Sequence, residues 1–357
     1  MSPEMAAIKS PAMIALESLL SRYQELEAAG GWPVFKPSAQ KIEPGATDAR
    51  LKTVRAILAI MGDLEDQESA TPESYDAVLV AGIKRFQQRH GLAEDGILGK
   101  TTQEALAVPV GKRIRQIQGT LKRMADFRPD ASGRYLVVNL PEFYLRGYKQ
   151  GNVVMEMKVV VGTPKDPTPQ FTKEMTYVSF NPHWGVPIRI AAEEMLPKII
   201  ENPNFFTEQD FAVYELTEEG RKEIDPATVD WSQHNKDHFP YLLRQRPGKG
   251  NALGKIKFGL KNSNDVYMHD TSSPKFFLRD IRAFSHGCMR LEKPYEMARF
   301  VFDGKENFTQ EKLDMLYNDS ESRIVPIPSL TVHTVYWSAW EDADGKANFR
   351  KDIYGLD

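Results

Sequence analysis

The only cysteine of the 357-residue chain, Cys288, stands in a segment, residues 284–291, that also contains His286. A second histidine, His269, lies 19 residues upstream at the end of a β-type run. A cysteine attacks a carbonyl as the thiolate and therefore needs a nearby base. Gly287 permits a tight turn in which backbone N–H groups can face a developing oxyanion. Because a strand end and a following loop can bring His269 to Cys288, the spacing indicates a cysteine nucleophile with a histidine base.

Two other interpretations of these residues stay open on the sequence alone. The cysteine could be a packed thiol with surface histidines nearby. Zinc could be held by Cys288, His269 and His286, but these residues lack the paired spacing of zinc ligands. We therefore expect no metal and no cofactor. A single cysteine excludes an internal disulfide.

The composition is that of a globular protein and limits its partners. Hydrophobic residues make up 41% and charged residues 27%, which allows a sizeable core and excludes a disordered chain. Lys+Arg number 46 against 49 Asp+Glu, so the net charge of -3 supplies no general attraction to nucleic acid. No run of 18 apolar residues exists, so we expect no membrane-spanning helix. No signal peptide is visible at the N-terminus.

Helical periodicity dominates the first 132 residues. Apolar residues recur at helical spacing over 12–26 and 50–61, and the sequence Thr-Pro-Glu-Ser at 71–74 resembles a further helix start. We expect a helical scaffold segment over 1–48, a compact helical module over 49–107 and a scaffold or linker helix over 108–132.

A β-rich pattern follows and favours a mainly β domain over 133–357, because β-branched and aromatic runs are separated by Gly and Pro. Strands are expected over 134–140, 153–161, 175–180, 266–268 and 331–337. Between about 190 and 246 the chain is acidic, with helix-like patches and four prolines. This stretch predicts a helical insertion between strands, and long insertions of this kind often act as lids.

Two resemblances to known families add to this interpretation. Residues 285–290 read Ser-His-Gly-Cys-Met-Arg and, with His269 upstream, resemble the signature of the L,D-transpeptidases, which have a YkuD-type domain. The likeness extends to residues 135–140, 160–164 and 251–258. Residues 86–92 and 95–102 are similar to the peptidoglycan-binding type 1 module.

The two resemblances together imply a multi-domain α+β protein of the large Gram-negative branch of L,D-transpeptidases. Its catalytic domain would be a mainly β, YkuD-like sandwich with a helical capping insertion. An all-α peptidoglycan-binding module and a helical scaffold would precede that domain.

The resemblance also implies a reaction on the peptide stems of the bacterial cell wall. Cys288 would attack the carbonyl of the third stem residue, release D-Ala and form a thioester. The side-chain amine of a neighbouring stem would then resolve the thioester and give a 3→3 cross-link. His269 would hold the thiolate as an imidazolium and pass its proton to the leaving amine.

The remaining motif residues receive expected roles from the same resemblance. The oxyanion hole and its loop are assigned to Gly287, His286 and Ser285. Substrate-binding or structural roles are assigned to Arg290, Tyr267 and Asp270. Arg290 would bind a substrate carboxylate or form an internal ion pair, and Asp270 would orient His269 through its backbone. Four further histidines are expected to be non-catalytic: His183, His234, His238 and His333.

Other functions remain compatible with the same residues. An L,D-carboxypeptidase or a protein-anchoring transpeptidase would share Cys288 and His269, and a non-catalytic wall-binding protein would keep the fold alone. The expected partners are peptidoglycan stems and glycan, with other cell-wall enzymes as candidates. The family resemblance further implies labelling of Cys288 by carbapenems. Since peptidoglycan lies outside the cytoplasmic membrane, we expect a periplasmic location.

Overall fold

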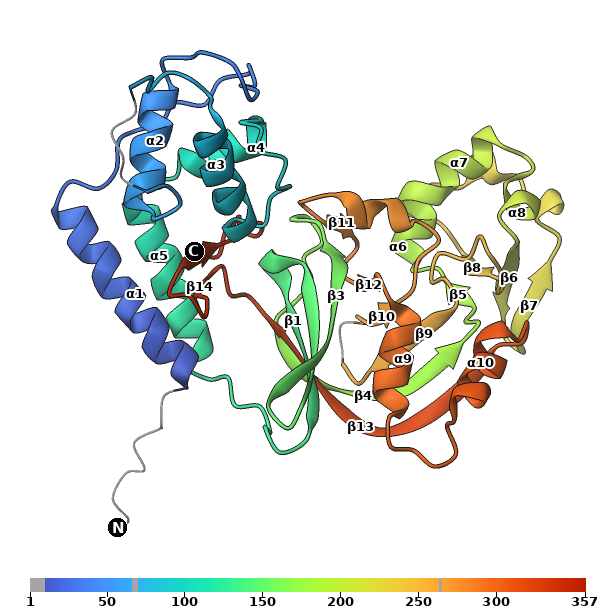
Figure 1. Ribbon diagram of the computed structural model, residues 1–357. Helices are drawn as coiled ribbons and strands as arrows, with labels where there is room; N and C mark the ends of the chain where they lie inside the picture. The colour runs from blue at the N-terminus through green and yellow to red at the C-terminus, as the bar shows by residue number, and fades with distance from the viewer. Residues whose placement is uncertain (1–9, 66–69, 263–264) are drawn as a thin grey trace, which may run out of the picture. The chain divides into compact units, whose positions relative to one another are not determined.

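The structure, a computed structural model, describes residues 10–65, 70–262 and 265–357. The chain divides into two compact units (Figure 1). The first holds residues up to 129 together with 139–142 and 335–357, and the second holds 130–138 and 143–334. The first nine residues of the expected scaffold segment lie outside the described residues.

The first unit is helical, as the periodicity of its sequence predicts. Its helices are α1 (Pro11–Ala28), α2 (Leu51–Ile60), α3 (Ala77–Arg89), α4 (Lys100–Leu106) and α5 (Val110–Met124). Their apolar faces share one core. Helix α3 begins after Asp76, whose carboxylate accepts from the Leu79 N–H at 2.9 Å, and not at residues 71–74. None of the described helices is long and apolar enough to cross a membrane.

The C-terminal segment 335–357 completes this helical unit. It carries the hairpin of β14 (Ala339–Glu341) and β15 (Ala347–Phe349). The fully buried ring of Phe349 packs 5.5 Å from the ring of Tyr23, and the guanidinium of Arg113 lies 4.5 Å above it. The prediction that all of 133–357 forms the catalytic domain is therefore corrected for these last residues. An apolar pattern predicts a strand but does not specify which core the strand joins.

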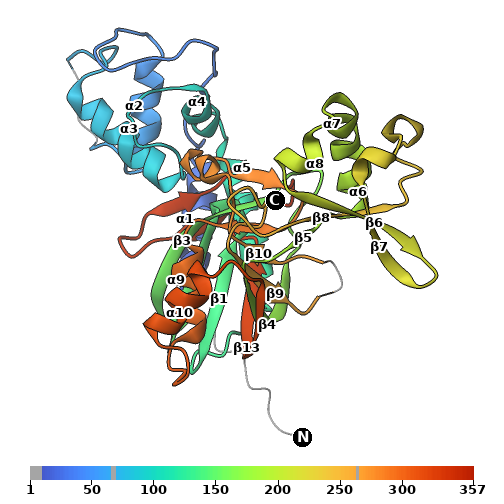
Figure 2. The same ribbon diagram turned by 90° about the vertical axis from the view of Figure 1, so that its right-hand side faces the viewer.

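The second unit is built on one β-sheet that closes on itself. Its strand order is β11-β3-β12-β10-β9-β4-β13-β1-β2, and β2 pairs with β3 as well. The strands are β1 (Arg134–Asn139), β2 (Tyr144–Lys149), β3 (Asn152–Gly162), β4 (Phe171–Phe180), β9 (Ile256–Leu260), β10 (Met268–His269), β11 (Ala283–Ser285), β12 (Met289–Leu291) and β13 (Arg323–Val335). Helices α9 (Pro294–Phe302) and α10 (Gln310–Asn318) are neighbours in both ribbon views (Figure 2).

The insertion follows β4 and has its own sheet and core. Its helical part comprises α6 (Ile188–Ile190), a π-helical turn (Ala191–Met195), α7 (Leu196–Glu201) and α8 (Phe205–Glu208). Its strands are β5 (Trp184–Gly185), β6 (Phe211–Thr217), β7 (Gly220–Ile224) and β8 (Tyr241–Gln245), in the order β5-β8-β6-β7. The expectation of a helical insertion is therefore corrected to a mixed α and β one. Its acidic, proline-containing sequence hid β6, in which only the first three residues, Phe211, Ala212 and Val213, are buried.

Candidate active site

Sheet register brings the two residues proposed for catalysis onto one face. Strands β10 and β12 are parallel neighbours in which His269 pairs with Arg290 and Met268 with Met289. Side chains alternate along a strand, so Met268 and Met289, both fully buried, point into the core. His269 and Arg290 point the other way. Cys288, two residues before Arg290, lies on that same outer face.

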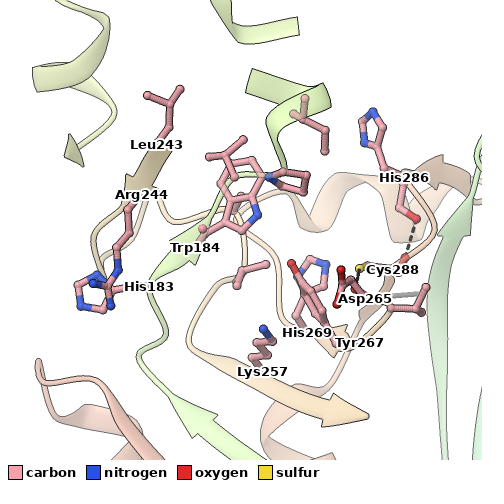
Figure 3. A pocket seen from close by; sticks show the side chains of 18 of the residues that line it. His183, Trp184, Leu243, Arg244, Lys257, Asp265, Tyr267, His269, His286 and Cys288 are labelled. Atoms are coloured by element: carbon pink, nitrogen blue, oxygen red, sulfur yellow. Dashed lines mark hydrogen bonds between the residues drawn. The ribbon is translucent and has the colours of Figure 1, made fainter. Parts of the chain in front are cut away.

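Tyr267 and Lys257 complete this face. The Met289 N–H donates to the Tyr267 carbonyl at 3.0 Å, which makes Tyr267 the cross-strand neighbour of Cys288. Lys257 on β9 pairs with His269, and its ammonium lies 3.9 Å from the centre of the Tyr267 ring. Figure 3 shows the side chains of these residues around one cavity.

The loop that presents Cys288 is held by its own polar groups. The Ser285 hydroxyl donates to the Cys288 carbonyl at 2.5 Å, and Ser285 is almost fully buried. Gly287 has φ of 104°, a left-handed conformation that favours glycine. Its N–H donates to Ser285 Oγ at 3.3 Å, so one of the amides expected in the oxyanion hole is engaged within the loop.

The segment that follows β3 also supports the Cys288 loop, through Thr168. The Thr168 hydroxyl donates to the Gly287 carbonyl at 2.8 Å and accepts from the Gly162 N–H at 2.9 Å. The backbone of residues 166–168 passes so close to Gly162 that a Cβ on this glycine would lie 2.7 Å from the Thr168 nitrogen. The position of the nucleophile loop therefore depends on how closely the backbones at Gly162 and Thr168 approach.

We expect Gly162→Ala to destabilise the protein by about 2 kcal/mol, because overpacking costs roughly 1–3 kcal/mol. A Cβ there would overlap the Asp166 carbonyl oxygen and lie 2.7 Å from the Thr168 nitrogen. Urea unfolding measures the effect. Gly250→Ala is the matched control, because its Cβ would meet no atom within 4 Å. Equal stability of the two variants would contradict this packing argument.

His269 is held as a neutral imidazole. Its Nδ1 lies 2.5 Å from the Asp270 carbonyl oxygen, which can only accept, so Nδ1 carries the hydrogen and Nε2 the free lone pair. Burial, together with the charges of Arg290 and Lys257, lowers the pKa of His269 to about 3. The imidazole is therefore uncharged at neutral pH and able to accept a proton.

The Cys288 thiol is also neutral in this resting state. Burial raises its pKa, although hydrogen bonds from Tyr267 and the charges of Lys257 and Arg290 oppose that shift. The expectation that His269 holds the thiolate as an imidazolium is therefore corrected for the resting protein. Burial disfavours the charge on both groups, so we infer that the proton moves only as the sulfur attacks.

The other predicted residues occupy distinct positions. The Asp270 carboxylate accepts from the backbone N–H groups of Lys255 at 2.8 Å and Thr271 at 2.7 Å, so it faces away from His269. Arg290 forms no ion pair with any residue of the described ranges, and its guanidinium lies 5.8 Å from the centre of the Phe276 ring. The internal ion pair considered for Arg290 is thus not found there.

His286 points to the insertion rather than to Cys288 (Figure 3). Its Nε2 lies 2.6 Å from the Glu194 carboxylate on the π-helical turn. A second ion pair joins the insertion to the rest of the catalytic domain, between Arg189 of α6 and Asp166 at 2.8 Å. Within the described part of the chain no three His, Cys, Asp or Glu side chains gather as a metal site requires, so the zinc interpretation has no support there.

Lys257 had no predicted role, although it lies in residues 251–258, which resemble the L,D-transpeptidases. We expect Lys257→Met to raise the pKa of Cys288 and to slow alkylation at pH 8 on the order of tenfold, because a nearby positive charge favours the thiolate. Iodoacetamide labelling against pH measures this directly, since the chain has one cysteine.

Lys255→Met is the matched control for that prediction. Lys255 precedes the same strand, but its ammonium donates to the Tyr317 carbonyl at 3.2 Å and does not line the cavity. An unchanged labelling profile for Lys257→Met would show that the ammonium does not act on the sulfur.

Comparison with known families agrees with this geometry. Residues 133–307 match the L,D-transpeptidase catalytic domain, YkuD, and residues 47–106 match the domain described as "Putative peptidoglycan binding domain". The chain therefore contains a YkuD L,D-transpeptidase catalytic domain, preceded by a peptidoglycan-binding domain.

Individual relatives carry the same description. A Haemophilus influenzae protein named "Putative L,D-transpeptidase" is 35% identical over 224 residues, which cover 62% of this chain and 44% of that protein. The chain thus matches less than half the length of this relative.

Two solved structures are L,D-transpeptidases from Mycobacterium smegmatis and Stackebrandtia nassauensis, both 14% identical to this chain. The first covers 56% of this chain and 58% of its own, with a TM-score of 0.27. The second covers 84% and 96%, with a TM-score of 0.29.

Proposed function

We propose that the chain is a peptidoglycan L,D-transpeptidase that forms 3→3 cross-links with Cys288 as nucleophile. The observation that carries the proposal is the shared outer face of β10 and β12, on which Cys288 faces the cavity beside neutral His269. A neutral imidazole that fixes its tautomer on the Asp270 carbonyl can accept the thiol proton through Nε2.

The proposed reaction has two steps, acylation of Cys288 and transfer of the acyl group to the acceptor amine. Cys288 Sγ attacks the carbonyl carbon of the third stem residue while its proton passes to His269. The bond to D-Ala then breaks, and His269 protonates the leaving amine. In the second step the acceptor amine attacks the thioester, an amide bond forms, and the proton returns to the sulfur through His269.

The cavity suits an anionic peptide substrate. It has a volume of about 1090 Å³, slightly above the roughly 300–1,000 Å³ typical of ligand sites. Six Lys and Arg residues line it, against two carboxylates, Glu194 and Asp265. The excess of positive charge favours the carboxylate groups of a wall stem.

Intact-mass analysis after incubation with a tetrapeptide stem tests the proposal. We expect a mass increase on Cys288 equal to the acyl tripeptide, followed by 3→3 dimers when a second stem is present. Shortened monomers alone would identify an L,D-carboxypeptidase. If neither the stem nor a carbapenem modified Cys288, the proposed enzyme function would fail, and the non-catalytic wall-binding protein would remain as the interpretation.

The cellular setting follows from the substrate. We propose that residues 47–106 hold the wall while the catalytic domain acts on its stems, and that both act in the periplasm. Peptidoglycan retention by the chain, measured by sedimentation with purified sacculi, tests the binding part separately from the chemistry.

A further inference from the structure

The cavity contains cations that no protein group neutralises. Of the six Lys and Arg residues that line it, five form neither an ion pair nor a side-chain hydrogen bond with any residue of the described ranges: Lys198, Arg221, Arg244, Lys257 and Arg290. Lys257 and Arg290 lie beside the nucleophile and influence its pKa. Arg244 belongs to the insertion and is not among the main influences on the pKa of Cys288, so an effect on the thiol does not explain its place in the cavity.

Arg244 lines the cavity from strand β8. On β8 it pairs with Gly185 of β5 and Ala212 of β6. Its neighbour Leu243 is almost fully buried in the core of the insertion. Because neighbouring side chains alternate, Arg244 points away from that core, and it is exposed at the cavity wall.

His183 lies beside Arg244 and adds a second polar group. Burial lowers the pKa of His183, and the charges of Arg244 and Arg246 lower it further, so its imidazole is neutral. Its Nδ1 is buried and has no hydrogen-bond partner. Figure 3 shows Arg244 reaching toward His183, with Trp184 between this pair and Cys288.

We propose that Arg244 and His183 form a carboxylate-binding subsite of the cavity, separate from the nucleophile face. A guanidinium binds a carboxylate through two parallel hydrogen bonds, and a neutral imidazole can donate a third. The ligand is a carboxylate of a wall stem peptide, on either the donor or the acceptor stem. This inference rests on the proposed function for its substrate class, and on the contacts of Arg244 and His183 for its site.

Equilibrium titration tests the subsite without any chemistry. In a Cys288→Ala background we expect Arg244→Gln to weaken binding of a stem tripeptide about 10- to 100-fold, since a charged hydrogen-bonded pair contributes about 1.5–3 kcal/mol. Arg246→Gln is the matched control. It removes the same charge two residues along, but Arg246 pairs with Asp210 and Glu223 and does not line the cavity.

Amidated peptides identify the carboxylate. One stem carboxylate at a time is converted to the carboxamide. One of these analogues should bind the Cys288→Ala protein more weakly than the unmodified tripeptide does. The affinity of that analogue should not fall further when Arg244→Gln is added. Equal affinities of Arg244→Gln and Arg246→Gln for the tripeptide, or no measurable binding to the parent, would overturn the subsite. A failure of the proposed function appears elsewhere, as the absence of a thioester on wild-type Cys288.

Kinetics distinguish the two stems. If the subsite holds the donor, Arg244→Gln raises the donor concentration needed for half-maximal acylation about tenfold or more. If it holds the acceptor, acylation is unchanged, and the acceptor concentration for half-maximal dimer formation rises by that factor. Unchanged values in both measurements would overturn the proposal.

Discussion

Cys288→Ala is expected to lower the rate of acylation by a tetrapeptide stem at least about 10⁴-fold. Loss of the nucleophile removes the atom that forms the thioester, and comparable removals in a serine protease cost about 10⁶-fold. Intact mass after incubation with the stem is the readout. Wild-type protein should gain the acyl mass, whereas the variant should remain unmodified.

The structure predicts that this variant stays folded. Cys288 is a partly exposed thiol whose sulfur makes a weak contact, 3.9 Å, with the Asp265 carbonyl oxygen and accepts hydrogen bonds from Tyr267. Thermal unfolding of Cys288→Ala should therefore match that of the wild type within a few degrees. An acyl adduct on a folded Cys288→Ala protein would assign the nucleophile to another residue and end the proposed mechanism.

His269→Gln is expected to slow acylation about 10³-fold, because positioned general bases contribute roughly 10²–10⁴-fold. Glutamine can still donate to the Asp270 carbonyl, but it cannot accept the thiol proton. The measured quantity is the single-turnover rate of thioester formation. His238→Gln, a change at an exposed histidine of the insertion, is the control and should leave that rate unchanged.

The pH profile separates this base from an ordinary histidine. Since the pKa of His269 is lowered to about 3, its imidazole stays unprotonated as the pH falls from 7 to 5. Wild-type acylation should therefore be nearly constant over that range and fall only as the pH approaches 3. A histidine that titrates near its usual value of about 6.5 would lose more than tenfold by pH 5. A decline of that size would contradict the neutral base.

Much of the candidate site was predictable because its residues are close together in the sequence. Residues 285–290 place the cysteine after a glycine that the turn requires, and the structure gives Gly287 a φ of 104°. The run before His269 alternates as a strand does, so a neighbouring strand was the natural place for the base. The helices of the first unit were likewise predictable, because apolar residues recur there with a period of about 3.6 residues.

Other features depend on pairings that no local pattern encodes. Lys257 lies near Cys288 because β9 pairs with β10, and Arg244 lines the cavity from β8, a strand of the insertion. The assignment of 335–357 failed for the same reason, since its strands join the helical unit through contacts distant in sequence.

The sequence by itself predicted a cysteine nucleophile and a histidine base, and it indicated the general class of each unit. These are properties of residue type and short-range spacing. The tertiary structure decided the protonation of the site, since the pKa of His269 depends on burial and on Arg290 and Lys257. It also decided which cations line the cavity, because burial and the pairing of strands are long-range outcomes of folding.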